Sequence, residues 1–148
     1  MRRVLLCIDG EGHTRKAVAY ALALARGLNS ELTALHVIDG FLLEKRISHE
    51  IYAVGREEYR AYVKEELQKE AERILQEFER LARDAGVKFR TKLRFGHPVE
   101  EVIAEAEEGS YDLVILGGKR RRGLWELKSR NLPLKVFRRL KMPVMVVR

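Results

Sequence analysis

The predicted fold begins with residues 4–10, which read Val4-Leu5-Leu6-Cys7-Ile8-Asp9-Gly10. Five consecutive apolar residues that end in an acid and a glycine are typical of a strand buried on both faces and followed by a tight turn. A helical pattern comes next, from Thr14 to Leu28, with apolar residues spaced by three and four. We expect Thr14 to cap this helix and Asn29 to end it. A buried strand that leads directly into an amphipathic helix predicts the first half of a βαβ unit.

The same alternation of short and long apolar patterns continues to the end of the chain. Further strands are predicted at Glu31–Ile38, Val87–Phe95, Tyr111–Leu116 and Val144–Arg148, and further helices at Glu57–Ala85, Pro98–Glu108 and Leu132–Leu140. Residues 40–56 show no clear period. Strands that alternate with helices predict right-handed crossovers and a parallel sheet covered on both faces. We therefore expect one α/β domain over residues 1–148, a three-layer sandwich around five parallel strands in the order 3-2-1-4-5.

Composition limits the class of protein. A chain of 148 residues with 46% hydrophobic and 34% charged residues suits one folded domain. Cys7 is the only cysteine, which excludes an intrachain disulfide and a cysteine-rich metal site. No apolar run is long enough to cross a bilayer, and the first one stops at Asp9 without a secretory cleavage site. We expect a cytoplasmic protein with no membrane partner, and the net charge of +7 favours anionic ligands.

A parallel sheet binds ligands beyond the carboxyl ends of its strands, at the point where the strand order reverses. The first such loop, residues 9–15, is not a dinucleotide fingerprint because Arg15 replaces the third glycine. The chain has no GxxxxGK[ST] phosphate loop, and no pattern specifies a nucleophile or an acid/base pair. No turnover enzyme is predicted, and the four histidines are not spaced as metal ligands. Only His97, which follows a predicted strand, is a candidate site residue among them.

The most basic stretch of the chain follows the fourth predicted strand. Six lysines and arginines lie between positions 119 and 130. Asn131 stands where it would cap the last helix, and free N–H groups at a helix start attract anions. We interpret this loop as an anion or phosphate site, with a solvated basic rim as the alternative. A third interpretation is nucleic-acid binding, in which Trp125 would stack on a base.

Five segments together carry a likeness to a known family. They are Val4–Gly10, Leu35-His36-Val37, Gly96-His97-Pro98, Asp112–Gly117 and Met142–Arg148. By their order and spacing, the chain resembles the universal stress protein family over nearly its whole length. ATP-binding members of that family carry a loop of the form G-x-x-G-x9-G-[ST] before the last helix. The resemblance places Gly117 at the first glycine, Arg120 at the second, Arg130 at the third and Asn131 at the hydroxyl residue.

The chain keeps only one of the three motif glycines, which alters the phosphate site that the resemblance implies. Glycine lets a backbone approach phosphates closely. An arginine would instead either fill the phosphate space or hold a phosphate with its guanidinium. The resemblance also implies that Asp9 lies near the nucleoside and that the backbone of Val37 meets the adenine. Because one branch of the family has lost these glycines and lacks ATP binding, two cofactor states stay open: no nucleotide or a weakly bound one, and ATP with Mg²⁺.

The leading hypothesis is a stress-response or regulatory protein with an altered ATP-binding loop and no strong catalysis. The resemblance implies a homodimer through the last strand, residues 144–148, whose apolar edge would be exposed in a monomer. One alternative is an ATP or nucleotide binder that uses Arg120, Arg130 and Asn131 at the phosphates. The alternative from another class is a nucleic-acid binder that uses residues 119–130.

Overall fold

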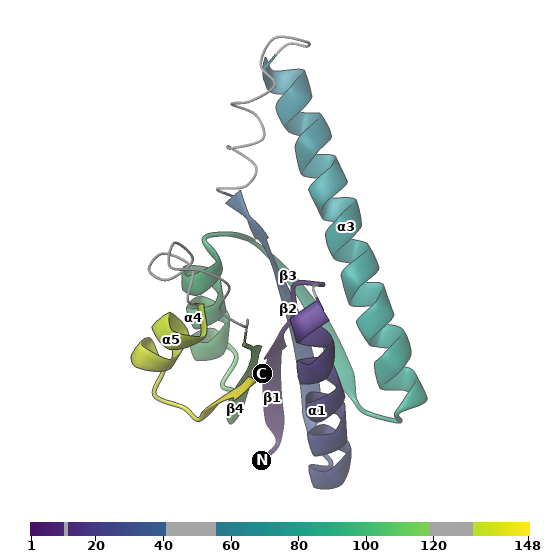
Figure 1. The fold of residues 1–148 in the computed structure, drawn as a ribbon, viewed down its shortest axis with the longest axis vertical. Helices are drawn as coiled ribbons and strands as arrows, with labels where there is room; N and C mark the ends of the chain where they lie inside the picture. The colour runs from purple at the N-terminus through teal and green to yellow at the C-terminus, as the bar shows by residue number, and fades with distance from the viewer. Residues whose placement is uncertain (11, 41–55, 119–131) are drawn as a thin grey trace.

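The computed structural model of the protein describes residues 1–10, 12–40, 56–118 and 132–148 (Figure 1). Its centre is a five-stranded sheet in the order β3-β2-β1-β4-β5, and every neighbouring pair of strands is parallel. The strands are β1 (Arg3–Cys7), β2 (Glu31–Asp39), β3 (Phe89–Gly96), β4 (Leu113–Gly117) and β5 (Val144–Val147). The predicted fold class and strand order are confirmed.

Helices cover both faces of the sheet. Figure 1 shows α1 (Gly12–Leu28) and α3 (Arg56–Asp84) on one face, and α4 (Pro98–Glu108) and α5 (Leu132–Arg139) on the other. Successive side chains of a strand point to opposite faces, so each inner strand contributes to two cores. In β1, Val4 and Leu6 pack with alanines of α1 and with Phe78 of α3. Leu5 and Cys7 pack with Val102 of α4 and Val136 of α5.

The helix ends follow the sequence signals with one exception. Asn29, predicted to end a helix, and Gly86, which follows the end of α3 closely, adopt left-handed backbone with φ of 52° and 69°. Pro98 occupies the first turn of α4, as expected. The prediction that Thr14 caps the first helix is wrong, because α1 already begins at Gly12. Thr14 therefore lies inside the first turn, where its side chain is buried.

A buried carboxylate attaches the edge strand β3 to α4. Glu105 accepts hydrogen bonds from Lys92 Nζ at 3.0 Å, Arg94 Nε at 3.2 Å and the Tyr111 hydroxyl at 2.9 Å. Burial raises the pKa of Glu105, but the hydrogen bonds from Lys92, Tyr111 and Arg94 outweigh burial and hold that pKa below its ordinary value. Glu105 is thus a charged group that the core tolerates because donors surround it.

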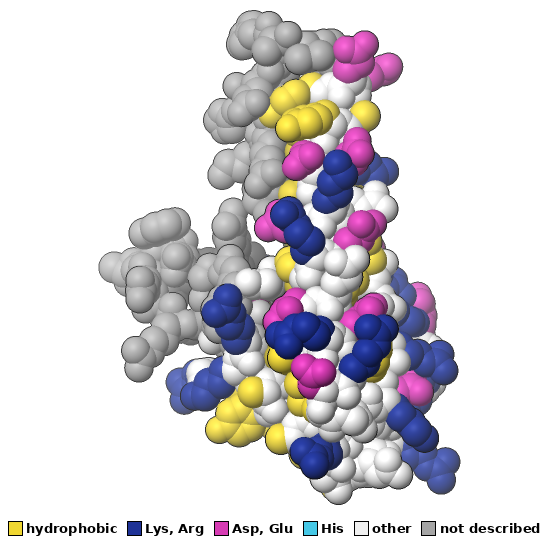
Figure 2. All heavy atoms as spheres, turned by 90° about the vertical axis from the view of Figure 1, so that its right-hand side faces the viewer, with side chains coloured by type: hydrophobic (Ala, Val, Ile, Leu, Met, Phe, Trp, Pro, Cys, Tyr) yellow, Lys and Arg dark blue, Asp and Glu magenta, His cyan; other side chains and the backbone are white. Residues whose placement is uncertain are grey.

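The long helix α3 has a charged outer face and extends past the sheet. Its outer side chains form ion pairs such as Glu77–Arg80 at 2.6 Å and Glu79–Arg83 at 3.5 Å. Figure 2 shows acidic and basic side chains interspersed over this side of the molecule. The 29 residues of α3 span about 44 Å, whereas the nine residues of β2 span about 30 Å. The amino-terminal part of α3 consequently projects beyond the carboxyl ends of the strands (Figure 1).

None of the helices in the described part of the chain is long and apolar enough to cross a membrane.

Candidate functional site

A cavity of about 530 Å³ lies at the carboxyl ends of the central strands. It lies where the strand order reverses, because β1 pairs with β2 on one side and with β4 on the other. This is the position at which open parallel sheets bind ligands, and the volume falls within the usual range of small-molecule sites. The fold therefore places a ligand-sized hollow where the sequence predicts one.

Three of the predicted site residues line this cavity together. They are Asp9, which follows β1, Val37 near the end of β2, and Gly117 at the end of β4. The other three, Arg120, Arg130 and Asn131, lie outside the described residues, as does the basic stretch 119–130. Gly117 and Leu132, which flank that stretch in the sequence, both line the cavity.

His97 does not line this cavity. It precedes α4 in extended conformation and borders a second, smaller hollow of about 260 Å³ beside Arg138 and Arg139 of α5. Its neighbour Pro98 does line the larger cavity. The candidate role of His97 in the main site is therefore not supported by its position.

The turn after β1 requires a glycine. Gly10 has φ of 81°, and a Cβ added there would lie 2.7 Å from Cδ1 of Ile74 on α3. The absence of a side chain lets α3 approach the end of β1 and form one wall of the cavity. After β4, the N–H of Gly118 donates a hydrogen bond to the carbonyl oxygen of Val147 at 2.7 Å. This bond holds the end of β4 against β5.

The floor and one side of the cavity are apolar. Cys7, Val37 and Leu116 lie on the strands, and Val102, Leu132 and Pro133 come from α4 and α5. Burial and the negative charge of Glu105 raise the pKa of the Cys7 thiol to about 12. Cys7 therefore stays protonated at neutral pH and acts as a small apolar residue. Such a surface suits a flat, uncharged ring system.

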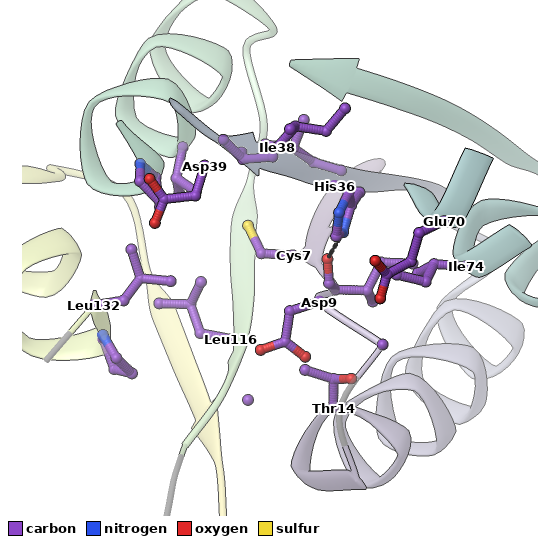
Figure 3. Close-up of a pocket in the computed structure, with 18 of the residues that line it drawn as sticks. Cys7, Asp9, Thr14, His36, Ile38, Asp39, Glu70, Ile74, Leu116 and Leu132 are labelled. Atoms are coloured by element: carbon purple, nitrogen blue, oxygen red, sulfur yellow. Dashed lines mark hydrogen bonds between the residues drawn. The ribbon is translucent and has the colours of Figure 1, made fainter. Parts of the chain in front are cut away.

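Polar groups gather on the remaining walls. Asp9, Thr14, His36, Asp39 and Glu70 line the cavity, and Figure 3 shows Asp9 between the apolar side at Leu116 and the α3 side at Glu70. The imidazole Nδ1 of His36 lies 2.8 Å from the carbonyl oxygen of Ile8. A carbonyl oxygen only accepts, so Nδ1 carries the proton and the ring is fixed against the end of β1.

Sequence reasoning missed the α3 wall, which consists of Leu67, Glu70 and Ile74. The periodicity of α3 assigns Leu67 and Ile74 to the core and Glu70 to the solvated face. The signal that could have revealed this wall is length, because a helix about 14 Å longer than the strand beneath it must overhang one end of the sheet.

The described residues contain no group of three or more His, Cys, Asp or Glu side chains arranged to hold a metal ion. The cavity is thus an apolar pocket with a carboxylate-rich rim, suited to binding a small molecule that carries both a ring and hydrogen-bond donors.

Comparison with known proteins decides the family. Residues 1–148 match the universal stress protein family. The chain belongs to the universal stress protein family. It is similar to the universal stress protein YxiE of Bacillus subtilis, with 28% identity over 99% of this chain and 98% of the relative.

Solved structures agree with this assignment. The structure of MJ0577 from Methanocaldococcus jannaschii superposes with a TM-score of 0.79 at 25% identity, over 99% of this chain and 94% of that one. Two more distant universal stress proteins share the fold. One, from Archaeoglobus fulgidus in complex with dAMP, has a TM-score of 0.70 at 15% identity over 100% of this chain and 98% of that one. The other, from Arabidopsis thaliana with AMP bound, has 0.67 at 17% identity over 99% and 91%.

Proposed function

We propose that this protein is a regulatory member of the universal stress protein family that binds an adenine nucleotide in the cavity and has no strong catalytic activity. The observation that carries the proposal is the position of Asp9, Val37 and Gly117 on one cavity of about 530 Å³ at the reversal of strand order. The adenine would lie on the apolar floor beside Val37, with the ribose toward Asp9. Relatives of the same fold with AMP or dAMP bound support this choice of ligand.

The phosphates would meet the loop that follows Gly118. This loop carries Arg120 and Arg130 in place of two motif glycines, so the backbone cradle for a triphosphate is altered. We therefore propose that binding depends mainly on the nucleoside and the first phosphate, and that the affinity for ATP is close to the affinity for AMP. Any Mg²⁺ would arrive with the phosphates.

Isothermal titration of the purified protein with AMP, ATP, and ATP with Mg²⁺ tests this proposal. We expect binding in the micromolar range for AMP and an affinity for ATP within about tenfold of it, because few contacts are reserved for the β- and γ-phosphates. Absence of binding by all three ligands at millimolar concentration would contradict nucleotide binding. An ATP affinity a hundredfold above that of AMP would contradict the altered-loop part alone.

We also propose that the protein forms a homodimer through β5. This strand pairs only with β4 in the described structure, and its side chain Val146 is 42% exposed. An unpaired apolar edge strand favours association with another strand, and a second copy of the chain offers the same edge.

A further inference from the structure

Glu70 is an acidic residue on the side of α3 that borders the cavity. Leu67, Glu70 and Ile74 are spaced by three and four residues, so they share one face of the helix. Other carboxylates of α3 pair with cations of the same helix, such as Glu65 with Lys69 and Glu79 with Arg83. No residue in the described ranges forms an ion pair with Glu70. Its carboxylate is thus available to a ligand in the cavity.

His36 presents a second acceptor to the same space. Residues alternate along β2, so His36 faces the α3 layer while Leu35 and Val37 face the α4 and α5 layer. Its Nδ1–H is bonded to the Ile8 carbonyl, which leaves Nε2 as an acceptor in the neutral ring. No described side-chain nitrogen or oxygen is buried without a partner, and no described residue bonds Nε2. Nε2 is therefore accessible, on a residue that lines the cavity.

The α3 side of the cavity consequently offers hydrogen-bond acceptors to a ligand. Figure 3 shows Glu70 and His36 on this side, with Asp9 between them and the apolar side. On the opposite side, ribose hydroxyls would lose their partners beside Leu116, Leu132 and Val102, and the carboxylate that Figure 3 shows on that side, Asp39, already has a partner within the protein. A group with two adjacent hydroxyls and a connection to a flat ring fits both halves of the cavity.

We infer that Glu70 and the Nε2 atom of His36 bind the ribose hydroxyls of the nucleotide and so distinguish ribonucleotides from deoxyribonucleotides. This inference rests on the proposed nucleotide binding and adds a preference for ribonucleotides over deoxyribonucleotides. A hydrogen bond from a ribose hydroxyl to a carboxylate is worth roughly a factor of ten or more in affinity. Loss of that hydroxyl would leave the acceptor without its donor.

Titration calorimetry with AMP, 2′-deoxy-AMP and 3′-deoxy-AMP tests the inference on the wild-type protein and three variants. Glu70→Gln keeps the shape but removes the charge. His36→Asn keeps an amide N–H at the position of Nδ1 for the Ile8 carbonyl and removes Nε2. Glu72→Gln is the control, because two residues further along α3 the side chain points to nearly the opposite side of the helix and does not line the cavity.

We expect the wild-type protein and Glu72→Gln to bind AMP about tenfold more tightly than at least one deoxy analogue. Glu70→Gln and His36→Asn should reduce this ratio to within about twofold by weakening AMP alone, with unfolding temperatures that confirm folded protein. Equal affinity of the wild type for AMP and both analogues, or a full ratio in Glu70→Gln, would overturn the inference and leave nucleotide binding intact. No AMP binding by the wild type would overturn the proposed function and the inference with it.

Discussion

At the scale of single residues, Glu105 is a buried carboxylate surrounded by hydrogen-bond donors. Its side chain is almost fully buried, yet it accepts hydrogen bonds from three donors: Lys92 and Arg94 on β3, and Tyr111 before β4. Removing the charge would leave these donors with a weaker acceptor at a buried position. The carboxylate therefore contributes to stability through its partners rather than through packing.

We expect Glu105→Gln to lower the free energy of unfolding by about 2 kcal/mol at pH 7, measured by urea denaturation. Because the pKa of Glu105 is held below its ordinary value of 4.5, this contribution is complete above pH 4.5 and decreases as the pH falls through the lowered pKa. The difference between wild type and variant should therefore shrink under acid conditions.

The matched control for this change is Glu108→Gln, which removes another carboxylate bonded to Arg94. Glu108 is exposed, so its loss should change stability by no more than about 0.5 kcal/mol. Equal effects of the two substitutions would show that burial of Glu105 is not what makes its hydrogen bonds matter.

At the scale of secondary-structure elements, β5 is a short edge strand, and among the described residues it pairs only with β4. An inserted lysine on such an edge opposes strand pairing because its charge would have to be buried against a second copy. We expect Val146→Lys to convert a dimer into a monomer in size-exclusion chromatography with light scattering. Leu28→Lys, at the exposed end of α1, should leave the dimer unchanged. A monomeric wild-type protein at tens of micromolar would contradict the proposed dimer, and a dimeric Val146→Lys would indicate another interface.

The elements also show what sequence can predict and what it cannot. Apolar runs and glycine, asparagine and proline signals located all nine helices and strands among the described residues, with ends within about two residues. Asp9, Val37 and Gly117 were found because the topology brings strand ends together. Glu70 was missed because its position at the cavity depends on how far α3 extends past the sheet. That distance depends on the lengths of both the helix and the strand, and the apolar pattern of either one alone does not reveal it.

At the scale of the whole molecule, the charge of the protein is concentrated in one stretch. Six cations and one carboxylate in residues 119–130 carry +5 of the net +7. The rest of the chain is thus nearly neutral, and any attraction to nucleic acid would depend on this stretch.

We expect single-stranded DNA to bind only through this charge, with an affinity that falls about 100-fold between 50 and 200 mM salt in fluorescence anisotropy. Replacing Arg120, Arg121 and Arg122 together with alanine should reduce the slope of log affinity against log salt by about 2, since three contacts to phosphates are removed. AMP binding in calorimetry should depend far less on salt. Tight binding of DNA at 200 mM salt, unaffected by the triple substitution, would instead indicate a dedicated nucleic-acid site.

The cavity touches both layers of helices: Leu67 and Ile74 of α3 on one side, and Leu132 and Pro133 of α5 on the other. In the part of the chain that the structure describes, the sheet lies between these two layers (Figure 1). A molecule held at the strand ends would therefore contact both helix layers at once. Binding of such a molecule would restrict the motion of α3 relative to α5. A partner protein that contacts both helices could therefore respond to the bound molecule without any large change in the shape of this protein.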